Sequence, residues 1–172
     1  PTLVPEPLPE EPFTEAEQAA FETYVSFITP NPRRIKRIVN IYRITRYLLN
    51  ITALAREAVI KWVIISEEWP FRTAWMLQQI EDDYQLGIGL SKTPDAALPE
   101  IYQKVKHHVK DERAKPLLVL DSDPEAFDQF ILLSPDLTVH DIYATLRPLT
   151  FNLNPAMRSE VLRAAAVNNL QR

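Results

Sequence analysis

Glycine is almost absent from this chain of 172 residues while proline is common, and this imbalance restricts the possible folds. Only Gly87 and Gly89 are present, against fifteen prolines. Sheet proteins use glycine in their hairpin turns, whereas a helix accepts proline in its first turn, where the N–H group has no partner anyway. The composition therefore predicts an all-α protein, an irregular helical bundle of about seven helices with a Pro-rich N-terminal linker.

The spacing of the prolines also divides the chain. Residues 1–12 hold five prolines at near-alternate positions, which is typical of an extended, polyproline-like linker. A segment docked on the domain, or a ligand for a polyproline-binding groove, are the alternatives for this segment. We expect residues 13–172 to form a single helical domain with a flexible loop over residues 85–98. Because the chain begins with Pro1 rather than Met, we expect it to be a fragment of a longer protein.

Helix-start signals recur along the chain. Thr14 and Glu17 form a T-x-x-E capping box, and Asn31 followed by Pro32 combines a good N-cap with a good first helical residue. Further helices are expected to begin near Thr52, Pro70, Pro99, Asp123, Asp136 or Thr138, and Asn154.

The helix expected after Thr52 is apolar on nearly all sides between Val59 and Ile65, which predicts that it forms the buried centre of the domain. Glu67 and Glu68 follow this apolar run, and adjacent carboxylates of this kind are expected at a solvated helix end.

The stretch from residue 31 to residue 49 predicts a basic amphipathic helix. Its cations are Arg33, Arg34, Lys36, Arg37, Arg43 and Arg46, and its apolar stripe consists of Ile35, Ile38, Val39, Tyr42, Leu48 and Leu49. Arg33 and Arg34 fall in the first turn, where the helix macrodipole disfavours cations. Two such residues indicate an anionic partner, which would also meet the free backbone N–H groups.

This basic helix has three possible interpretations. It could be a solvated amphipathic helix whose arginines pair with carboxylates, which the acidic N-terminal segment could supply, since residues 1–31 hold six glutamates and no Lys or Arg. It could bind nucleic acid, although the net charge of −4 and the lack of interleaved exposed aromatics disfavour this. It could also contact a nucleotide phosphate held by another domain.

The rest of the sequence shows no pattern of a disulfide, a metal site, a membrane span or a catalytic site. The chain has no cysteine, which excludes disulfides and thiolate metal sites and fits a cytoplasmic protein. His107 and His108 are adjacent and cannot share a metal ion, and His140 stands alone, so we expect no metal site. No apolar run is long enough to span a membrane. We find no catalytic constellation and expect that this chain alone is not an enzyme.

The run Leu117-Leu-Val-Leu-Asp121 resembles a Walker B strand. A Walker B strand works with a phosphate-binding loop, and the motif G-x-x-x-x-G-K-[ST] occurs nowhere in the chain. We therefore interpret the run as an apolar turn or a short helix.

Two segments resemble the KAP family of P-loop NTPases. Residues 31–43 read N-P-R-R-I-K-R-I-V-N-I-Y-R and match the family pattern N-P-R-x-x-K-R-x-x-N, which lies downstream of the P-loop core. Residues 59–70, V-I-K-W-V-I-I-S-E-E-W-P, are similar to the K-W-x-x-L-x-x-x-W-P region of the family. Together these segments lie within roughly residues 30–76.

The resemblance implies that the chain is the C-terminal, lid-like helical region of a KAP-type ATPase, downstream of its Walker motifs. Arg33 and Arg37 would then be nucleotide-phosphate sensors, the parent would use ATP and magnesium, and the partner of this chain would be the P-loop core. No cofactor is expected in this chain alone. The family includes membrane-associated signalling proteins and bacterial phage-exclusion proteins, so the parent could associate with a membrane. The alternative is a helical protein-interaction scaffold whose basic helix binds an acidic partner segment.

Overall fold

The computed structural model describes residues 11–49, 56–84, 96–108, 120–121 and 123–147. These form the α-helices α1 (Glu15–Tyr24), α2 (Pro32–Leu49), α3 (Arg56–Glu68), α4 (Pro70–Tyr84), α5 (Leu98–His108), α7 (Pro124–Leu132) and α8 (Val139–Asp141). A 3₁₀ turn, η1 (Val25–Phe27), extends α1, and a π turn, η2 (Ile142–Leu146), extends α8. Across this part of the chain the only strand-like pairing is an isolated bridge between Ala97 and Thr138, which confirms the predicted all-α fold.

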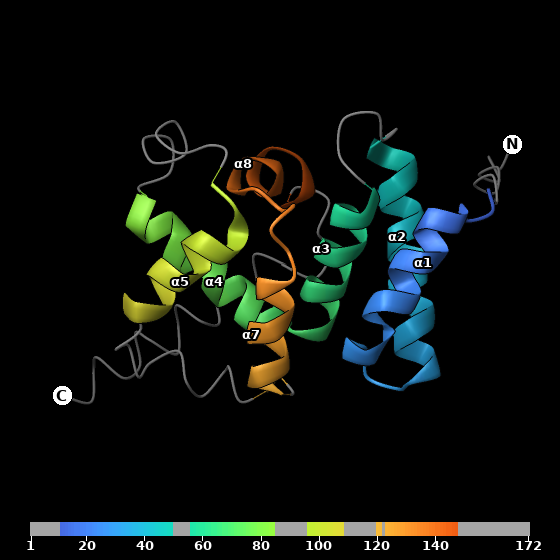
Figure 1. Cartoon of the computed structure of the whole chain (residues 1–172), viewed down its shortest axis with the longest axis horizontal. Coiled ribbons are helices and arrows are strands. Elements are labelled where there is room, and N and C mark those ends of the chain that lie inside the picture. Colours follow the sequence, from blue (N-terminus) through green and yellow to red (C-terminus); the bar gives the residue numbers. More distant parts are fainter. Residues whose placement is uncertain (1–10, 50–55, 85–95, 109–119, 122, 148–172) are drawn as a thin grey trace, which may run out of the picture.

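Helix α3 lies in the middle of the molecule, with α1 and α2 on one side and α4, α5, α7 and α8 on the other (Figure 1). Every residue from Ala58 to Glu68 is buried, and the Trp62 side chain is 2% exposed. The prediction of a central helix is therefore confirmed. Such a helix is apolar on nearly all sides because it has a neighbour in nearly every direction.

One hydrophobic core runs from Ala20 to Leu146 through the described helices. The Phe130 ring on α7 connects the two sides of the molecule. Its centroid lies 5.4 Å from that of Tyr24, 5.0 Å from that of Phe27 and 5.7 Å from that of Trp69. Residues about a hundred positions apart in the sequence thus contribute to the same aromatic cluster.

The helix starts follow the local signals in the sequence. The Thr14–Glu17 capping box is formed, and the Asn31 side chain accepts a hydrogen bond from the Arg33 backbone N–H at 2.9 Å. Thr138, rather than Asp136, caps α8. In the described part of the chain no helix is both long and apolar enough to cross a membrane.

Some apolar residues do not pack as their spacing predicted. Leu48 and Ile35 of the expected stripe on α2 are 52% and 37% exposed. Leu48 lies about a quarter turn from the line through Ile38 and Tyr42 at 100° per residue, so it misses the neighbouring helices.

The linker over residues 1–12, the loop over 85–98, the helix start near Thr52 and the helix after Asn154 lie wholly or largely outside the described residues.

Candidate functional site: the basic helix α2

Helix α2 runs antiparallel to α3, and its first turns meet the end of α3. Arg34 Nη1 lies 3.1 Å from Glu68 Oε2, and Arg37 Nε lies 2.9 Å from Glu67 Oε2. Both glutamate side chains are almost completely buried, at 1% and 4% exposure. The expectation of solvated carboxylates was therefore wrong, because the end of α3 is covered rather than open to water.

The antiparallel packing explains the arginines in the first turn of α2. Cations are disfavoured at the N-terminus of a helix, and carboxylates are disfavoured at the C-terminus. Here Arg34 lies near the N-terminus of α2 and Glu68 lies at the C-terminus of α3, and the two side chains pair with each other. Glu68 also accepts hydrogen bonds from the Thr29 backbone N–H at 3.2 Å and hydroxyl at 2.8 Å. The charges that each helix would disfavour alone thus neutralise each other in the pair.

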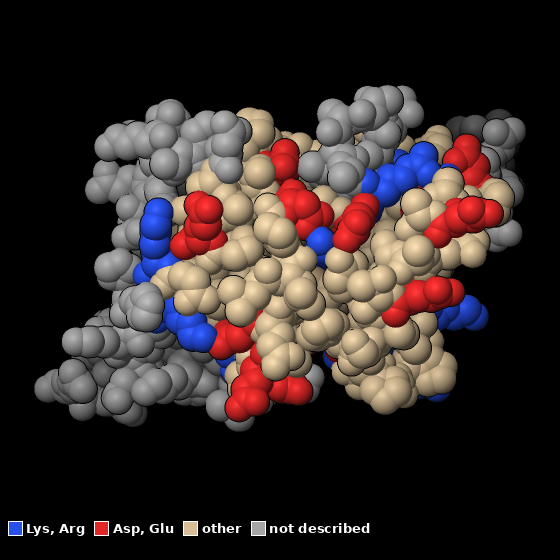
Figure 2. All heavy atoms as spheres, in the orientation of Figure 1, with Lys and Arg blue, Asp and Glu red and all other residues tan. Residues whose placement is uncertain are grey.

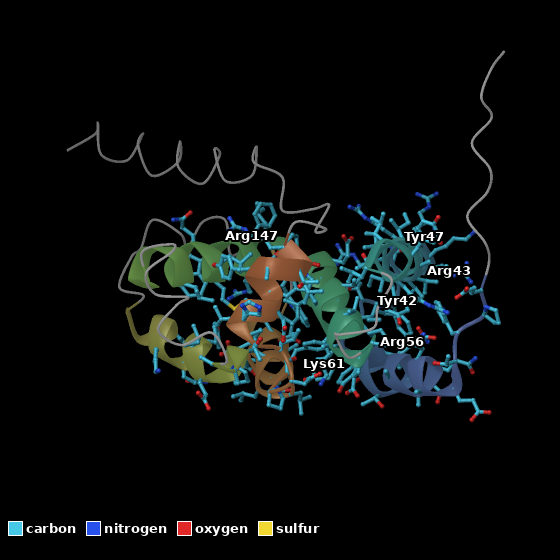
Figure 3. The ribbon with its side chains drawn as sticks, turned by 90° about the horizontal axis from the view of Figure 1, so that it is seen from above. Tyr42, Arg43, Tyr47, Arg56, Lys61 and Arg147 are labelled. Atoms are coloured by element: carbon cyan, nitrogen blue, oxygen red, sulfur yellow. The ribbon has the colours of Figure 1, made fainter. Side chains whose placement is uncertain are left out.

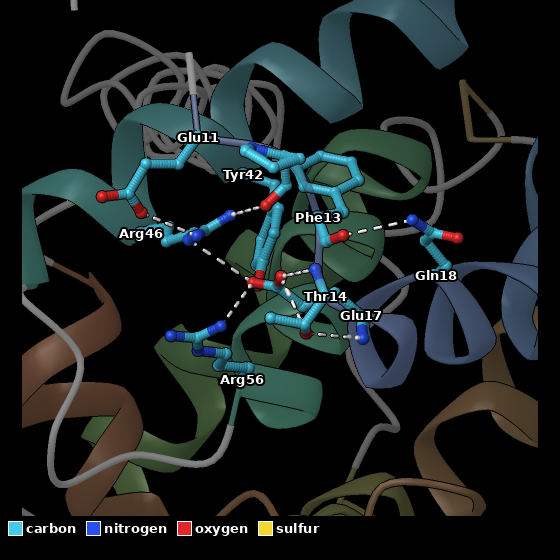
Figure 4. A network of polar contacts seen from close by, with 9 residues as sticks. Glu11, Phe13, Thr14, Glu17, Gln18, Tyr42, Arg46 and Arg56 are labelled. Carbon is cyan, nitrogen blue, oxygen red and sulfur yellow. Dashed lines mark hydrogen bonds and ion pairs between the residues drawn. The ribbon is translucent and has the colours of Figure 1, made fainter. Parts of the chain in front are cut away.

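The other half of α2 is held by a buried carboxylate on α1 (Figure 4). Glu17 Oε1 accepts a hydrogen bond from the Tyr42 hydroxyl at 2.5 Å and lies 3.5 Å from Arg46 Nε and 3.4 Å from Arg56 Nη1. The second oxygen of Glu17 accepts hydrogen bonds from the Thr14 backbone N–H at 2.7 Å and from its hydroxyl at 3.0 Å. One carboxylate therefore caps α1 and joins it to α2 and α3.

These contacts change the proton affinities of both partners. Burial raises the pKa of Glu17, but the hydrogen bonds from Tyr42 and Thr14 and the charge of Arg46 outweigh burial, so the pKa lies below its ordinary value of 4.5. Burial and the hydrogen bond to Glu17 raise the pKa of the Tyr42 hydroxyl. The network therefore holds a carboxylate and a neutral tyrosine at neutral pH.

Residues just before α1 contact one side of the C-terminal half of α2. Glu11 Oε2 accepts a hydrogen bond from Arg46 Nη2 at 2.8 Å. The Phe13 ring lies 5.6 Å from the Tyr42 ring, and the Arg43 guanidinium carbon lies 5.3 Å from the Phe13 centroid. The acidic N-terminal segment thus supplies partners in cis, as the first interpretation of the basic helix expected.

The two residues proposed from sequence as phosphate sensors lie one turn apart and therefore on the same side of α2. The Arg33 side chain is exposed and has no ion-pair or hydrogen-bond partner among the described residues. The Arg37 side chain is 58% exposed even while it pairs with Glu67. Both are accessible at the surface, and Arg37 would have to exchange its partner to bind a phosphate.

Asp121, the carboxylate of the Walker B-like run, accepts a hydrogen bond from the start of α4. Its Oδ2 accepts a hydrogen bond from the Arg72 backbone N–H at 2.6 Å, in the first turn of α4. Such a contact satisfies one of the N–H groups that a helix start leaves without an intrahelical partner. Burial raises the pKa of Asp121 above its ordinary value, while the N–H groups of Arg72 and Phe71 act in the opposite direction.

Sequence reasoning missed Lys61, a buried cation in the middle of α3. Its Nζ lies 2.6 Å from Asp136 Oδ1 and 3.2 Å from Glu57 Oε1, and 5.2 Å from the Tyr24 ring centroid. Glu57 also accepts a hydrogen bond from the Tyr24 hydroxyl at 2.6 Å. A lysine inside an otherwise apolar run was the available signal, because a buried charge requires a partner. The described residues contain no group of three or more His, Cys, Asp or Glu that could hold a metal ion.

Comparison with known proteins identifies relatives over most of the chain. NTPase KAP family P-loop domain-containing protein 1 of Mus musculus is 30% identical over 157 residues, and the Homo sapiens protein matches to the same extent. Kinase D-interacting substrate of 220 kDa of Rattus norvegicus is 29% identical over 142 residues. No family model and no solved structure matches the chain.

The matches cover most of this chain but only part of each relative. The aligned residues are 84% of this chain and 25% of the mouse KAP family protein, and 78% of this chain and 8% of the rat protein. The matched region is much longer than the two short segments that first indicated the resemblance. These homologues support membership of the chain in the KAP family of P-loop NTPases.

Proposed function

We propose that this chain is a lid-like helical domain that follows the P-loop core of a KAP-type ATPase and couples its nucleotide state to helix packing. The observation that carries the proposal is the exposed Arg33 guanidinium in the first turn of α2. Arg34, its neighbour, is already neutralised by a buried carboxylate, whereas Arg33 has no partner among the described residues. An exposed arginine without a carboxylate partner in the first turn of a helix fits a contact to a nucleotide phosphate.

The chain would supply a contact to the nucleotide and not the whole site. It carries no G-x-x-x-x-G-K-[ST] motif, so the loop that cradles the phosphates would belong to the core of the parent protein. No metal-binding cluster occurs in the described residues, so magnesium would also be held by that core. ATP with magnesium would supply the phosphoryl group, and Arg33 would stabilise negative charge on it.

Arg37 would couple the nucleotide state to the packing of α2 on α3. Its ion pair with Glu67 joins α2 to α3, and the exposed guanidinium lies on the same side of α2 as Arg33. If Arg37 moves from Glu67 to a phosphate, the buried Glu67 carboxylate loses a charged partner in the nucleotide-bound state. This exchange would make the packing of α2 on α3 depend on the nucleotide.

The test uses the full-length parent protein in an ATPase assay. Arg33→Ala should lower kcat by about tenfold or more, because an arginine at the phosphate stabilises the transition state. Lys104→Ala removes an exposed cation from α5 and should leave kcat unchanged. An unchanged kcat in Arg33→Ala, with the fold intact by circular dichroism, would overturn the sensor role.

A calorimetric titration of the present chain with Mg-ATP provides a second test. Because the phosphate loop is absent from its sequence, it should show no tight binding. Micromolar affinity would contradict the division of the site between two parts of the parent.

A further inference from the structure

The outer face of α2 carries cations that the fold leaves unneutralised. Helix α2 contains six Lys or Arg and no Asp or Glu, so no carboxylate on the helix itself can pair with them. Three of these cations pair with glutamates from other parts of the chain, namely Arg34, Arg37 and Arg46. The remaining cations are Arg33, Lys36 and Arg43, which have no ion-pair partner among the described residues, although the Arg43 guanidinium lies against the Phe13 ring.

These residues form one straight stripe along the helix. At 100° per residue, five exposed residues fall within an arc of about 80°, opposite the buried Ile38 and Tyr42. They are Arg33, Lys36, Asn40, Arg43 and Tyr47. In Figure 3, Arg43 and Tyr47 project from the outer side of α2, whereas Tyr42 points toward the other helices. The stripe is about 21 Å long at a rise of 1.5 Å per residue.

The composition of the stripe specifies its partner. Its members are spaced alternately three and four residues apart, which is the spacing that a second helix lying alongside would match. Three of the five are cations, and Tyr47, which is 56% exposed, offers an apolar surface at one end. A complementary helix would carry carboxylates at the same spacing and an apolar residue near one end.

A nucleic acid fits this surface less well. The stripe has only three cations, and the chain as a whole has a net charge of −4. Acidic side chains are spread over the face shown in Figure 2, with few cations between them. The net negative charge would oppose a long polyanion, whereas a short acidic helix can contact the stripe alone.

We propose that the stripe Arg33, Lys36, Asn40, Arg43 and Tyr47 is a docking surface for an acidic amphipathic helix of a partner protein. The proposal does not depend on the nucleotide role of Arg33, because it rests on the whole length of the helix.

The probe is a fluorescent helical peptide of about 18 residues with glutamates at alternating spacings of three and four and one leucine near an end. Its anisotropy is measured with the 172-residue chain. We expect saturable binding that weakens as salt is added, because exposed ion pairs are screened. A peptide with glutamine in place of every glutamate should not bind.

Two exposed lysines give a matched pair of variants. Lys36 and Lys104 both lie on helices, and neither has an ion-pair partner among the described residues. Lys36→Glu should weaken peptide binding by about three- to tenfold, since it replaces an attraction with a repulsion. Lys104→Glu should leave it unchanged, and Tyr47→Ala should weaken it by severalfold without loss of helical signal.

Several results would overturn the proposal. These are no binding of the glutamate peptide, equal binding of the glutamine peptide, or equal effects of Lys36→Glu and Lys104→Glu. Tighter binding of a single-stranded RNA oligonucleotide or of anionic phospholipid vesicles would assign the stripe to another ligand. Binding that emerges only after removal of residues 1–10 would assign it to the N-terminal segment of the chain itself. Since the ATPase test changes Arg33 and this test changes Lys36 and Tyr47, failure of one is distinguishable from failure of the other.

Discussion

The Tyr42 hydroxyl donates a hydrogen bond of 2.5 Å to the Glu17 carboxylate, inside the junction of α1 and α2. The same carboxylate completes the capping box of α1 and lies near Arg46 and Arg56. The start of α1 is therefore fixed by contacts to two other helices as well as by its own local sequence. A change at this carboxylate should affect the whole junction.

Tyr42→Phe tests the hydrogen bond itself. The substitution keeps the ring and removes one donor from a buried, ionised carboxylate, so we expect a loss of about 2 kcal/mol in the free energy of unfolding. Urea denaturation followed by circular dichroism measures it. Tyr47→Phe removes a hydroxyl from an exposed ring and should change stability by less than about 0.5 kcal/mol. Equal effects of the two substitutions would contradict the role of the Glu17 contact.

Glu17 should also make stability depend on pH in the acid range. Its pKa in the folded protein lies below the ordinary value of 4.5, so its contribution is present above that value and is lost as pH falls through the lowered pKa. Glu17→Gln should be less stable than the wild type at pH 7, and the difference should shrink below pH 4.5. Urea denaturation of both proteins from pH 3 to pH 7 measures it. A difference that is constant with pH would show that Glu17 is not stabilised as a carboxylate.

The Arg34–Glu68 pair should couple α2 to α3. Arg34 is partly solvated, so we expect a coupling energy of about 1 kcal/mol in a double-mutant cycle of Arg34→Ala and Glu68→Gln. The matched cycle of Arg33→Ala and Glu68→Gln should give no coupling, because no contact joins those side chains. Coupling of similar size in both cycles would mean that general electrostatics, rather than the pair, is responsible.

Asp121→Ala should destabilise α4 by about 1 kcal/mol, since it removes the acceptor for a backbone N–H in the first turn. Asp121→Asn keeps an acceptor oxygen and should be less damaging. Urea denaturation of both variants provides the comparison. If both variants were as stable as the wild type, the capping role would be wrong.

Trp62→Ala should lower the free energy of unfolding by about 3–5 kcal/mol, because a large side chain in the central helix leaves a cavity. Tyr47→Ala provides the comparison at an exposed aromatic. A loss below about 1 kcal/mol at Trp62 would show that α3 is not central to stability.

Features that depend on neighbouring residues were readable from the sequence. The Thr14–Glu17 capping box and the Asn31–Pro32 start use groups within three residues of each other, so their geometry is set by the helix they begin. The burial of α3 was also readable, because apolar residues on all sides of a helix require neighbours on all sides.

Features that depend on distant residues were not readable. Glu67 and Glu68 look like solvated carboxylates until the antiparallel packing brings Arg37 and Arg34 to them. The capping box identified Glu17, but its contact with Tyr42 joins residues 25 positions apart. For the candidate site, the sequence located the basic helix, and the fold was needed to separate its neutralised cations from those on the outer face.

The ring of Phe130 has a consequence for how the chain can be divided. It contacts Tyr24 and Phe27 near the first helix and Trp69 at the start of α4, so early and late helices complete one another's interior. A fragment that stops before α7 would leave these three rings facing water. Shortened forms of this chain should therefore retain Pro124–Leu132 if they are to unfold in one cooperative transition.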